Sequence, residues 1–98
     1  MSSDQRFTTI TSTGQAKTIS GGSTNMGPCR VTYIQAEGAG SAKLILRNDS
    51  SGSGEKLFEA DFGTEGLDIY VPGNGIRFDT TLHATLTATG SVTIGYTG

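Results

Sequence analysis

The C-terminal third of the chain, residues 66–98, alternates apolar and polar side chains with a period of two. The apolar members are Leu67, Ile69 and Val71, then Ile76 and Phe78, then Leu82, Ala84, Leu86 and Ala88, and then Val92, Ile94 and Tyr96. Successive side chains of a β-strand point to opposite faces, so this period puts the apolar groups on one face. The pattern predicts half-buried antiparallel strands, separated by turns at residues 72–75 and 89–90.

The rest of the chain also consists of strand-like segments. We expect strands at residues 6–13, 15–19, 29–37, 42–47 and 55–62, with turns rich in Gly, Ser and Asn between them. Apolar runs recur about every ten residues, which is typical of β-sandwiches and barrels. We therefore predict an all-β fold, namely a small antiparallel β-sandwich or jelly-roll-like barrel of about eight short strands.

Two of these segments leave alternatives open. In residues 29–37, Tyr33 shares a face with Val31, whereas Ile34 and Ala36 share the other face. That strand is either covered on both sides or carries a bulge near Tyr33. Residues 55–62 also fit a helical turn, but a strand is favoured because the segment lies between two Gly-rich turns.

A single domain is expected over residues 1–98, with residues 1–5 as a flexible N-terminal arm. The hydrophobic content is 34%, there is no Trp and there are 15 Gly residues, so the core is light. Ordering the chain costs roughly 1.5 kcal/mol per residue, which a thin core only just offsets. We therefore expect oligomerisation, because it buries a second surface.

Charge and cysteine usage narrow the classes of partner. The net charge is -2 and the basic residues are scattered, so nothing attracts nucleic acid. No apolar run is long enough for a bilayer, and the N-terminus does not resemble a signal peptide. With Cys29 as the only cysteine, we expect a soluble protein made in a reducing cytoplasm, bound neither to nucleic acid nor to a membrane.

No catalytic constellation is found in the sequence. His83 is the only histidine, and no Gly-x-Ser-x-Gly elbow accompanies it, so we interpret it as a solvated or interface side chain. A thiolate favoured by Arg30 is one interpretation of Cys29. The position of Cys29 at the start of an apolar strand favours the other interpretation, a small buried hydrophobic side chain. We therefore predict that the protein is not an enzyme and has no catalytic residue.

Metal and phosphate sites are not predicted either. The acidic residues between Asn48 and Asp68 lack the spacing of a calcium loop, and a solvated acidic rim is favoured. Residues 38–43 contain glycines and a lysine but lack the spacing and the following helix of a phosphate loop. No metal and no cofactor are therefore expected.

Threonine side chains are expected on outward faces of the strands. These threonines are Thr8, Thr11, Thr13, Thr85, Thr87, Thr93 and Thr97. Such faces are either solvated sheet or flat interfaces, since Thr loses little entropy on contact. We favour an interface on at least one face, with Tyr33, Tyr70 and Tyr96 as anchors.

Several motifs, taken in order, resemble a group of small β-sandwich proteins of about this length that tailed-phage genomes encode, often beside virion structural genes. They are the Thr-rich opening, Gly27-Pro28-Cys29-Arg30-Val31, Leu44-x-Leu46 before Asn48-Asp49, Ser51-Gly52-Ser53-Gly54-x-x-Leu57-Phe58, Gly75-Ile76-Arg77-Phe78, and Leu82-x-Ala84-x-Leu86-Thr87-x-Thr89-Gly90-Ser91-Val92-Thr93. The resemblance extends from about Thr8 to Tyr96. It departs at Arg47-Asn48-Asp49, where such proteins often have Tyr-Asp-Gly, so no role is carried over for that loop.

The resemblance implies a bacteriophage virion structural protein, made in the host cytoplasm and located on the capsid surface. The role it favours is a capsid decoration (cement) protein that binds the major capsid protein or another virion protein as a homo-oligomer, with a trimer favoured. The contact residues expected in that role are Arg6, Phe7, Tyr70, Thr85 and Thr87. The alternatives are a tail or fibre component and a carbohydrate-binding module, although the latter usually exposes more aromatic residues.

Overall fold

The computed structural model describes residues 5–19 and 22–97, and within them it has nine strands and one short 3-10 helix. The strands are β1 (Arg6–Ile10), β2 (Gly14–Gln15), β3 (Cys29–Ala36), β4 (Lys43–Asn48), β5 (Glu55–Asp61), β6 (Leu67–Tyr70), β7 (Ile76–Phe78), β8 (His83–Thr87) and β9 (Val92–Thr97). The 3-10 helix η1 (Gly63–Glu65) joins β5 to β6. The all-β prediction is confirmed, and the segment predicted at residues 55–62 is the strand β5, which ends at Asp61, rather than a helical turn.

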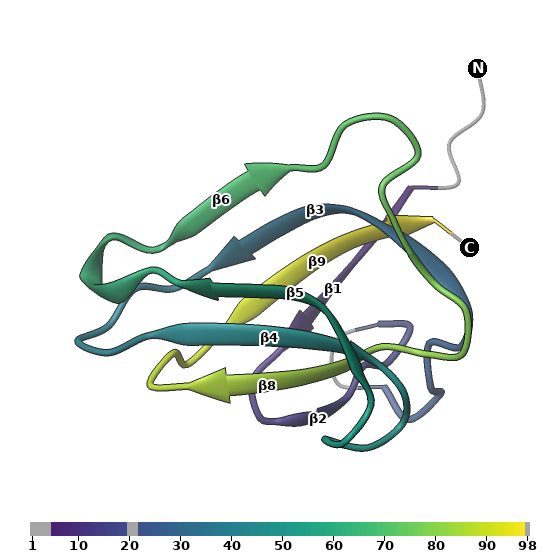
Figure 1. The fold of residues 1–98 in the computed structure, drawn as a ribbon, viewed down its shortest axis with the longest axis horizontal. Helices are drawn as coiled ribbons and strands as arrows, with labels where there is room; N and C mark the ends of the chain where they lie inside the picture. Colours follow the sequence, from purple (N-terminus) through teal and green to yellow (C-terminus); the bar gives the residue numbers. More distant parts are fainter. Residues whose placement is uncertain (1–4, 20–21, 98) are drawn as a thin grey trace.

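The strands form two antiparallel sheets that pack on each other as a small β-sandwich (Figure 1). Sheet A has the order β1-β9-β3-β6, and β7 pairs with the remaining length of β3. Sheet B has the order β2-β8-β4-β5. No helix in the described part of the chain is both long and apolar enough to cross a membrane.

The core lies between the two sheets and follows the predicted alternation. Leu44 and Leu46 of β4 are fully buried, as are Val92 and Ile94 of β9. The largest fully buried side chains are Tyr96, Phe78, Ile34, Leu44, Leu46, Leu82, Ile94, Val31 and Val92. The period of two therefore identified most of the interior. It fails at Ala88, which is exposed and has a positive φ of 63° in the turn after β8.

A bulge in β3 decides between the two interpretations of that strand. Its register against β9 shifts between Val31 and Tyr33, with Thr32 as the extra residue. One extra residue exchanges the two faces of a strand. The residues before and after the bulge that face the same core are Cys29 and Val31, then Ile34 and Ala36.

The edge of sheet A next to β3 is interrupted by a loop. Residues 71–75 leave β6, and the chain returns to β3 as β7. The loop stays close to β3, because the Val71 amide donates to the Thr32 carbonyl at 2.9 Å. Gly75 has a φ of 77°, and a Cβ there would lie 2.4 Å from the Val31 carbonyl oxygen. Only glycine fits that position without a shift of the backbone.

Near the N-terminus the structure corrects several expectations. The first strand ends at Ile10 rather than at residue 13, and the second is the two-residue β2 with an isolated bridge between Lys17 and Asn25. Thr8 faces the core and is 1% exposed, because β1 pairs with β9 in a register that turns Ile10 inward. Of the expected arm, residues 1–4 lie outside the described residues and Gln5 is exposed.

Candidate binding surface

One row of side chains crosses the outer face of sheet A from edge to edge. Phe7 of β1 pairs with Gly95 of β9, Gly95 pairs with Tyr33 of β3, and Tyr33 pairs with Tyr70 of β6. We call these four residues the aromatic row. Among the described residues, three large hydrophobic side chains are strongly exposed, and two of them, Phe7 at 56% and Tyr70 at 82%, are its ends.

The rings of the aromatic row form a continuous ridge rather than a flat platform. The centroids of Phe7 and Tyr33 are 6.1 Å apart with an interplanar angle of 78°. Those of Tyr33 and Tyr70 are 5.1 Å apart at 56°. Phe7 and Tyr33 also close over Gly95, where an added Cβ would lie 2.8 Å from Phe7 Cε1. Aromatic side chains often cover a glycine in this way on a neighbouring strand.

A polar row lies beside the aromatic row, two residues further along each strand. It consists of Thr9, Thr93, Gln35 and Asp68, in register order across the sheet. Thr9 and Thr93 share a hydroxyl hydrogen bond of 3.1 Å, and Tyr33 donates its hydroxyl to Asp68 at 2.7 Å. We call this the acidic row, because Asp68 gives it a negative charge.

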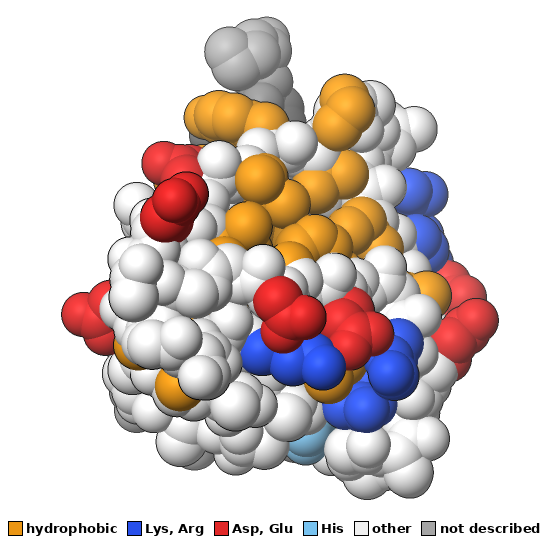
Figure 2. All heavy atoms as spheres, turned by 60° about the vertical axis from the view of Figure 1, so that its left-hand side comes forward, with side chains coloured by type: hydrophobic (Ala, Val, Ile, Leu, Met, Phe, Trp, Pro, Cys, Tyr) orange, Lys and Arg blue, Asp and Glu red, His pale blue; other side chains and the backbone are white. Residues whose placement is uncertain are grey.

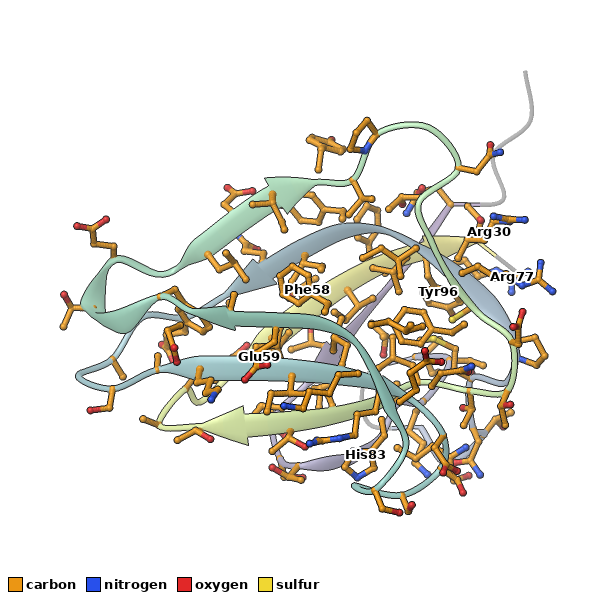
Figure 3. All side chains as sticks on the ribbon, in the orientation of Figure 1. Arg30, Phe58, Glu59, Arg77, His83 and Tyr96 are labelled. Carbon is orange, nitrogen blue, oxygen red and sulfur yellow. The ribbon has the colours of Figure 1, made fainter. Side chains whose placement is uncertain are left out.

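On the other side of the aromatic row lies a row with positive charge. Arg30 of β3 pairs with Thr97 of β9 and with Arg77 of β7. The two arginines lie together at one end of the sandwich (Figure 3). Arg77 Nε donates to Asp79 at 3.0 Å, and no ion pair to Arg30 is found among the described residues. Arg30, Arg77 and Thr97 form this row, which we call the arginine row.

The outer face of sheet B has a different chemistry. Lys43 and Lys56 both contact the carboxylate of Glu59, at 3.0 and 3.4 Å, and Arg47 donates to the Thr85 hydroxyl. The hydrogen bond from Lys43 is the main cause of a lowered Glu59 pKa. Thr87, next to this network, is exposed. This face is polar and its charges are largely paired.

The five predicted contact residues are therefore divided between opposite sheets. Phe7 and Tyr70 lie in the aromatic row, whereas Thr85 and Thr87 lie on sheet B. Arg6 is exposed at the start of β1 but has the strand parity of Thr8, which faces inward. The sequence pattern does not mark Gly95, Asp68 or the arginine pair as parts of one surface, because only the strand registers bring them together.

Tyr96 is not an anchor, contrary to the prediction. Its side chain is 2% exposed and lies in the core, as Figure 3 shows, and its hydroxyl donates to the Thr18 carbonyl at 2.7 Å. Tyr96 thus fastens the segment after β2 to the sandwich.

His83 is buried, so the prediction of a solvated or interface histidine is wrong. It lies on the outer side of β8, but the β4–β5 loop covers it (Figure 3). A Cβ at Gly52 would lie 3.6 Å from His83 Cε1. Its Nδ1 has no hydrogen-bond partner among the described residues, and neither does the Thr8 hydroxyl.

Cys29 is a small buried hydrophobe, as favoured. Burial raises the pKa of its thiol to about 11, and Arg77 offsets only part of that effect. The alternative of a thiolate favoured by Arg30 is therefore wrong.

Other candidate sites are less developed. Within residues 5–19 and 22–97, no three His, Cys, Asp or Glu side chains gather as a metal site would require. An open cleft of about 320 Å³ is lined by residues 9–15, Lys17, Ile19 and Gly22, with polar and apolar groups in similar proportion. A band of hydrophobic side chains shows where the core reaches the surface beside β5 and β6, the edge strands of the two sheets (Figure 2).

Comparisons with protein-family models, with curated proteins and with solved structures find no match to this chain.

Proposed function

We propose that this chain is a non-enzymatic virion structural protein that decorates the outer surface of a phage capsid as a homo-oligomer. The observation that carries the proposal is the contrast between the outer faces of its two sheets. Sheet A presents the exposed rings of Phe7 and Tyr70, whereas sheet B presents Thr85, Thr87 and paired charges. The motif resemblance to phage-encoded β-sandwich proteins supports the virion role.

A decoration protein that acts as a homo-oligomer makes two kinds of contact, one with other copies of itself and one with the shell. An aromatic ridge suits the first, because aromatic residues are enriched in the cores of protein interfaces. A hydroxyl-bearing face suits the second, since many copies on a symmetric shell make weak individual contacts adequate. We assign the shell contact to sheet B around Thr87.

The first test is quantitative mass spectrometry of purified particles of the virus that encodes the chain. Hundreds of copies per particle are expected for a shell protein. A handful would move the protein to a vertex or the tail, and absence would contradict the virion role.

The second test adds the recombinant protein to particles that lack it. Thr87→Arg is expected to reduce occupancy, because it places a long charged side chain on the proposed contact face. Thr11→Arg is the matched control, since Thr11 is also exposed but lies in the loop after β1. Equal occupancy of the two variants would remove sheet B from the proposal.

A carbohydrate-binding module is the second candidate, favoured by one observation. Tyr70 is 82% exposed and supplies a ring on which a sugar can stack, and Asp68 and Gln35 beside it supply hydrogen-bonding groups. The tilted rings leave room for one sugar to stack rather than a chain of them. A glycan array in which Tyr70→Ala abolishes every hit would favour this candidate over the shell.

A further inference from the structure

We infer that two copies of this chain pair through the outer faces of their A sheets, about a two-fold axis that runs along the aromatic row. The inference rests on the homo-oligomer of the proposed function and deepens it by naming the surface and the residue pairs. It starts from the three rows that the strand registers define on this face. The aromatic row is central, with the acidic row on one side and the arginine row on the other.

A two-fold axis along the central row has a definite consequence. It places each aromatic row opposite its own copy and exchanges the two outer rows. The acidic row of one copy then faces the arginine row of the other. Such a surface is self-complementary, which an isologous interface requires.

The pairing also matches residues within the rows. β6 and β7 occupy the same side of β3, one after the other. Asp68 of β6 therefore meets Arg77 of the second copy, and Gln35 meets Arg30 of the second copy. The interface contains each pair twice. Sheets that pack face to face lie about 10 Å apart, a gap that arginine and tyrosine side chains span from both sides.

The charges of the single chain favour a second copy as the partner of this face. Arg30 and Arg77 lie directly opposite each other on neighbouring strands, and like charges in that position destabilise a sheet. In the described part of the chain the only ion pair of these two is that of Arg77 with Asp79. Asp68 accepts a hydrogen bond from Tyr33 through Oδ1. Its second oxygen, Oδ2, is therefore the acceptor that we assign to Arg77 of the second copy.

The aromatic row supplies the apolar part of the contact. Phe7 and Tyr70 are the exposed ends of the ridge, so pairing buries rings that water covers in the single chain. The face spans four strands and three rows, roughly 20 Å in each direction. That is smaller than a standard interface, so we expect a dissociation constant in the micromolar range. A dimer replaces the trimer expected from the sequence. Its two B sheets face away from each other, so one copy of each dimer makes the shell contact assigned to sheet B.

The test is sedimentation equilibrium of the purified full-length chain from micromolar to millimolar concentration. The wild type is expected to be a monomer–dimer mixture. Asp68→Arg and Arg77→Asp each put like charges opposite one another, and each is expected to weaken the dimer by about tenfold or more. The double variant Asp68→Arg/Arg77→Asp restores opposite charges and is expected to recover dimerisation. Asp61 is exposed on sheet B, and Asp61→Arg makes the same change of charge as Asp68→Arg. This control is expected to leave dimerisation unchanged.

Three results would overturn the inference: a wild type that stays monomeric at millimolar concentration, a trimer, or a double variant no better than the single ones. Circular dichroism checks that each variant is folded, and the substituted side chains lie at the surface. The assay contains no virion. If the purified chain does not dimerise but occupies particles normally, only this pairing is removed. If it dimerises but is absent from particles, only the capsid role is removed.

Discussion

Tyr33 and Asp68 join the aromatic row to the acidic row through a hydrogen bond of 2.7 Å from the tyrosine hydroxyl to a carboxylate oxygen. This bond is the main cause of a raised Tyr33 pKa, because a phenolate could not donate it and would lie beside a negative charge. The bond also fixes the central ring of the row, which contacts Phe7 on one side and Tyr70 on the other.

Replacing Asp68 by Asn is expected to lower the Tyr33 pKa towards its ordinary value of 10.0. An NMR titration of the Tyr33 ring carbon measures this directly. Because the Tyr33 pKa is raised, the stabilisation that this hydrogen bond gives the folded state is fully present below pH 10. It is lost as the pH rises through the pKa of Tyr33 in the folded state. Asp61→Asn is the control, since Asp61 lies on the other sheet. A Tyr33 pKa that is equal in Asp68→Asn and wild type would contradict the assigned hydrogen bond.

Thr8→Val is expected to stabilise the protein. The Thr8 hydroxyl is buried without a hydrogen-bond partner in the described part of the chain, and such a group costs about 1 kcal/mol or more. Valine has nearly the same shape and leaves no polar group in the core. Urea unfolding should show a free energy of unfolding about 1 kcal/mol higher than that of the wild type.

Thr9→Val is the matched comparison for Thr8→Val. It breaks the hydrogen bond between the hydroxyls of Thr9 and Thr93 on the outer face of sheet A, so no stabilisation is expected. A loss of stability in Thr8→Val would mean that its hydroxyl has a partner after all.

The sequence predicted what depends on neighbours along the chain. Period-two alternation identified Leu44, Leu46, Val92 and Ile94 as interior, and the change of face at Tyr33 correctly allowed a bulge. It could not predict that Thr8 faces inward, because the face of a short strand is set by its register with β9, about 85 residues away.

The candidate surface was harder to predict for the same reason. Phe7, Tyr33 and Tyr70 were singled out individually, but their row depends on three strand registers that span most of the chain. Because Leu82 and Ala84 on either side of it face the core, alternation puts His83 on the outer side of its strand, as the structure has it. Its burial comes from the β4–β5 loop, and no local pattern predicts where a Gly- and Ser-rich loop folds.

Cys29 is expected to react slowly with thiol reagents in the native protein. Cys29 is 4% exposed, and with a pKa of about 11 almost none of its thiol is thiolate at neutral pH. Ellman's reagent should therefore label the urea-unfolded chain far faster than the native one. Equal labelling rates in the two states would contradict the burial.

The same thiol gives a pH dependence of stability. The unfolded thiol loses its proton near pH 9.0, whereas the folded one holds it to about 11. Unfolding therefore releases a proton between these values, and the free energy of unfolding should fall as the pH rises through that window. Cys29→Ala removes this contribution, so its stability should fall less steeply over the same range. Identical slopes would contradict the raised pKa.

The loop between β6 and β7 offers a sharp test of the backbone beside the candidate surface. Gly73 and Gly75 both have positive φ, 71° and 77°, but only Gly75 lies against β3. Gly73→Ala meets nothing within 4 Å, so it should cost only the left-handed conformation, about 1–2 kcal/mol.

Gly75→Ala adds a Cβ that would lie 2.4 Å from the Val31 carbonyl oxygen, a backbone atom that cannot rotate away. The loop or β3 must move, so we expect about 2 kcal/mol more destabilisation than for Gly73→Ala. Urea unfolding of both variants measures the difference. Because β7 and Arg77 follow this loop directly, Gly75→Ala should also weaken the proposed dimer, whereas Gly73→Ala should not. Equal stabilities of the two variants would mean that the loop does not rest on β3.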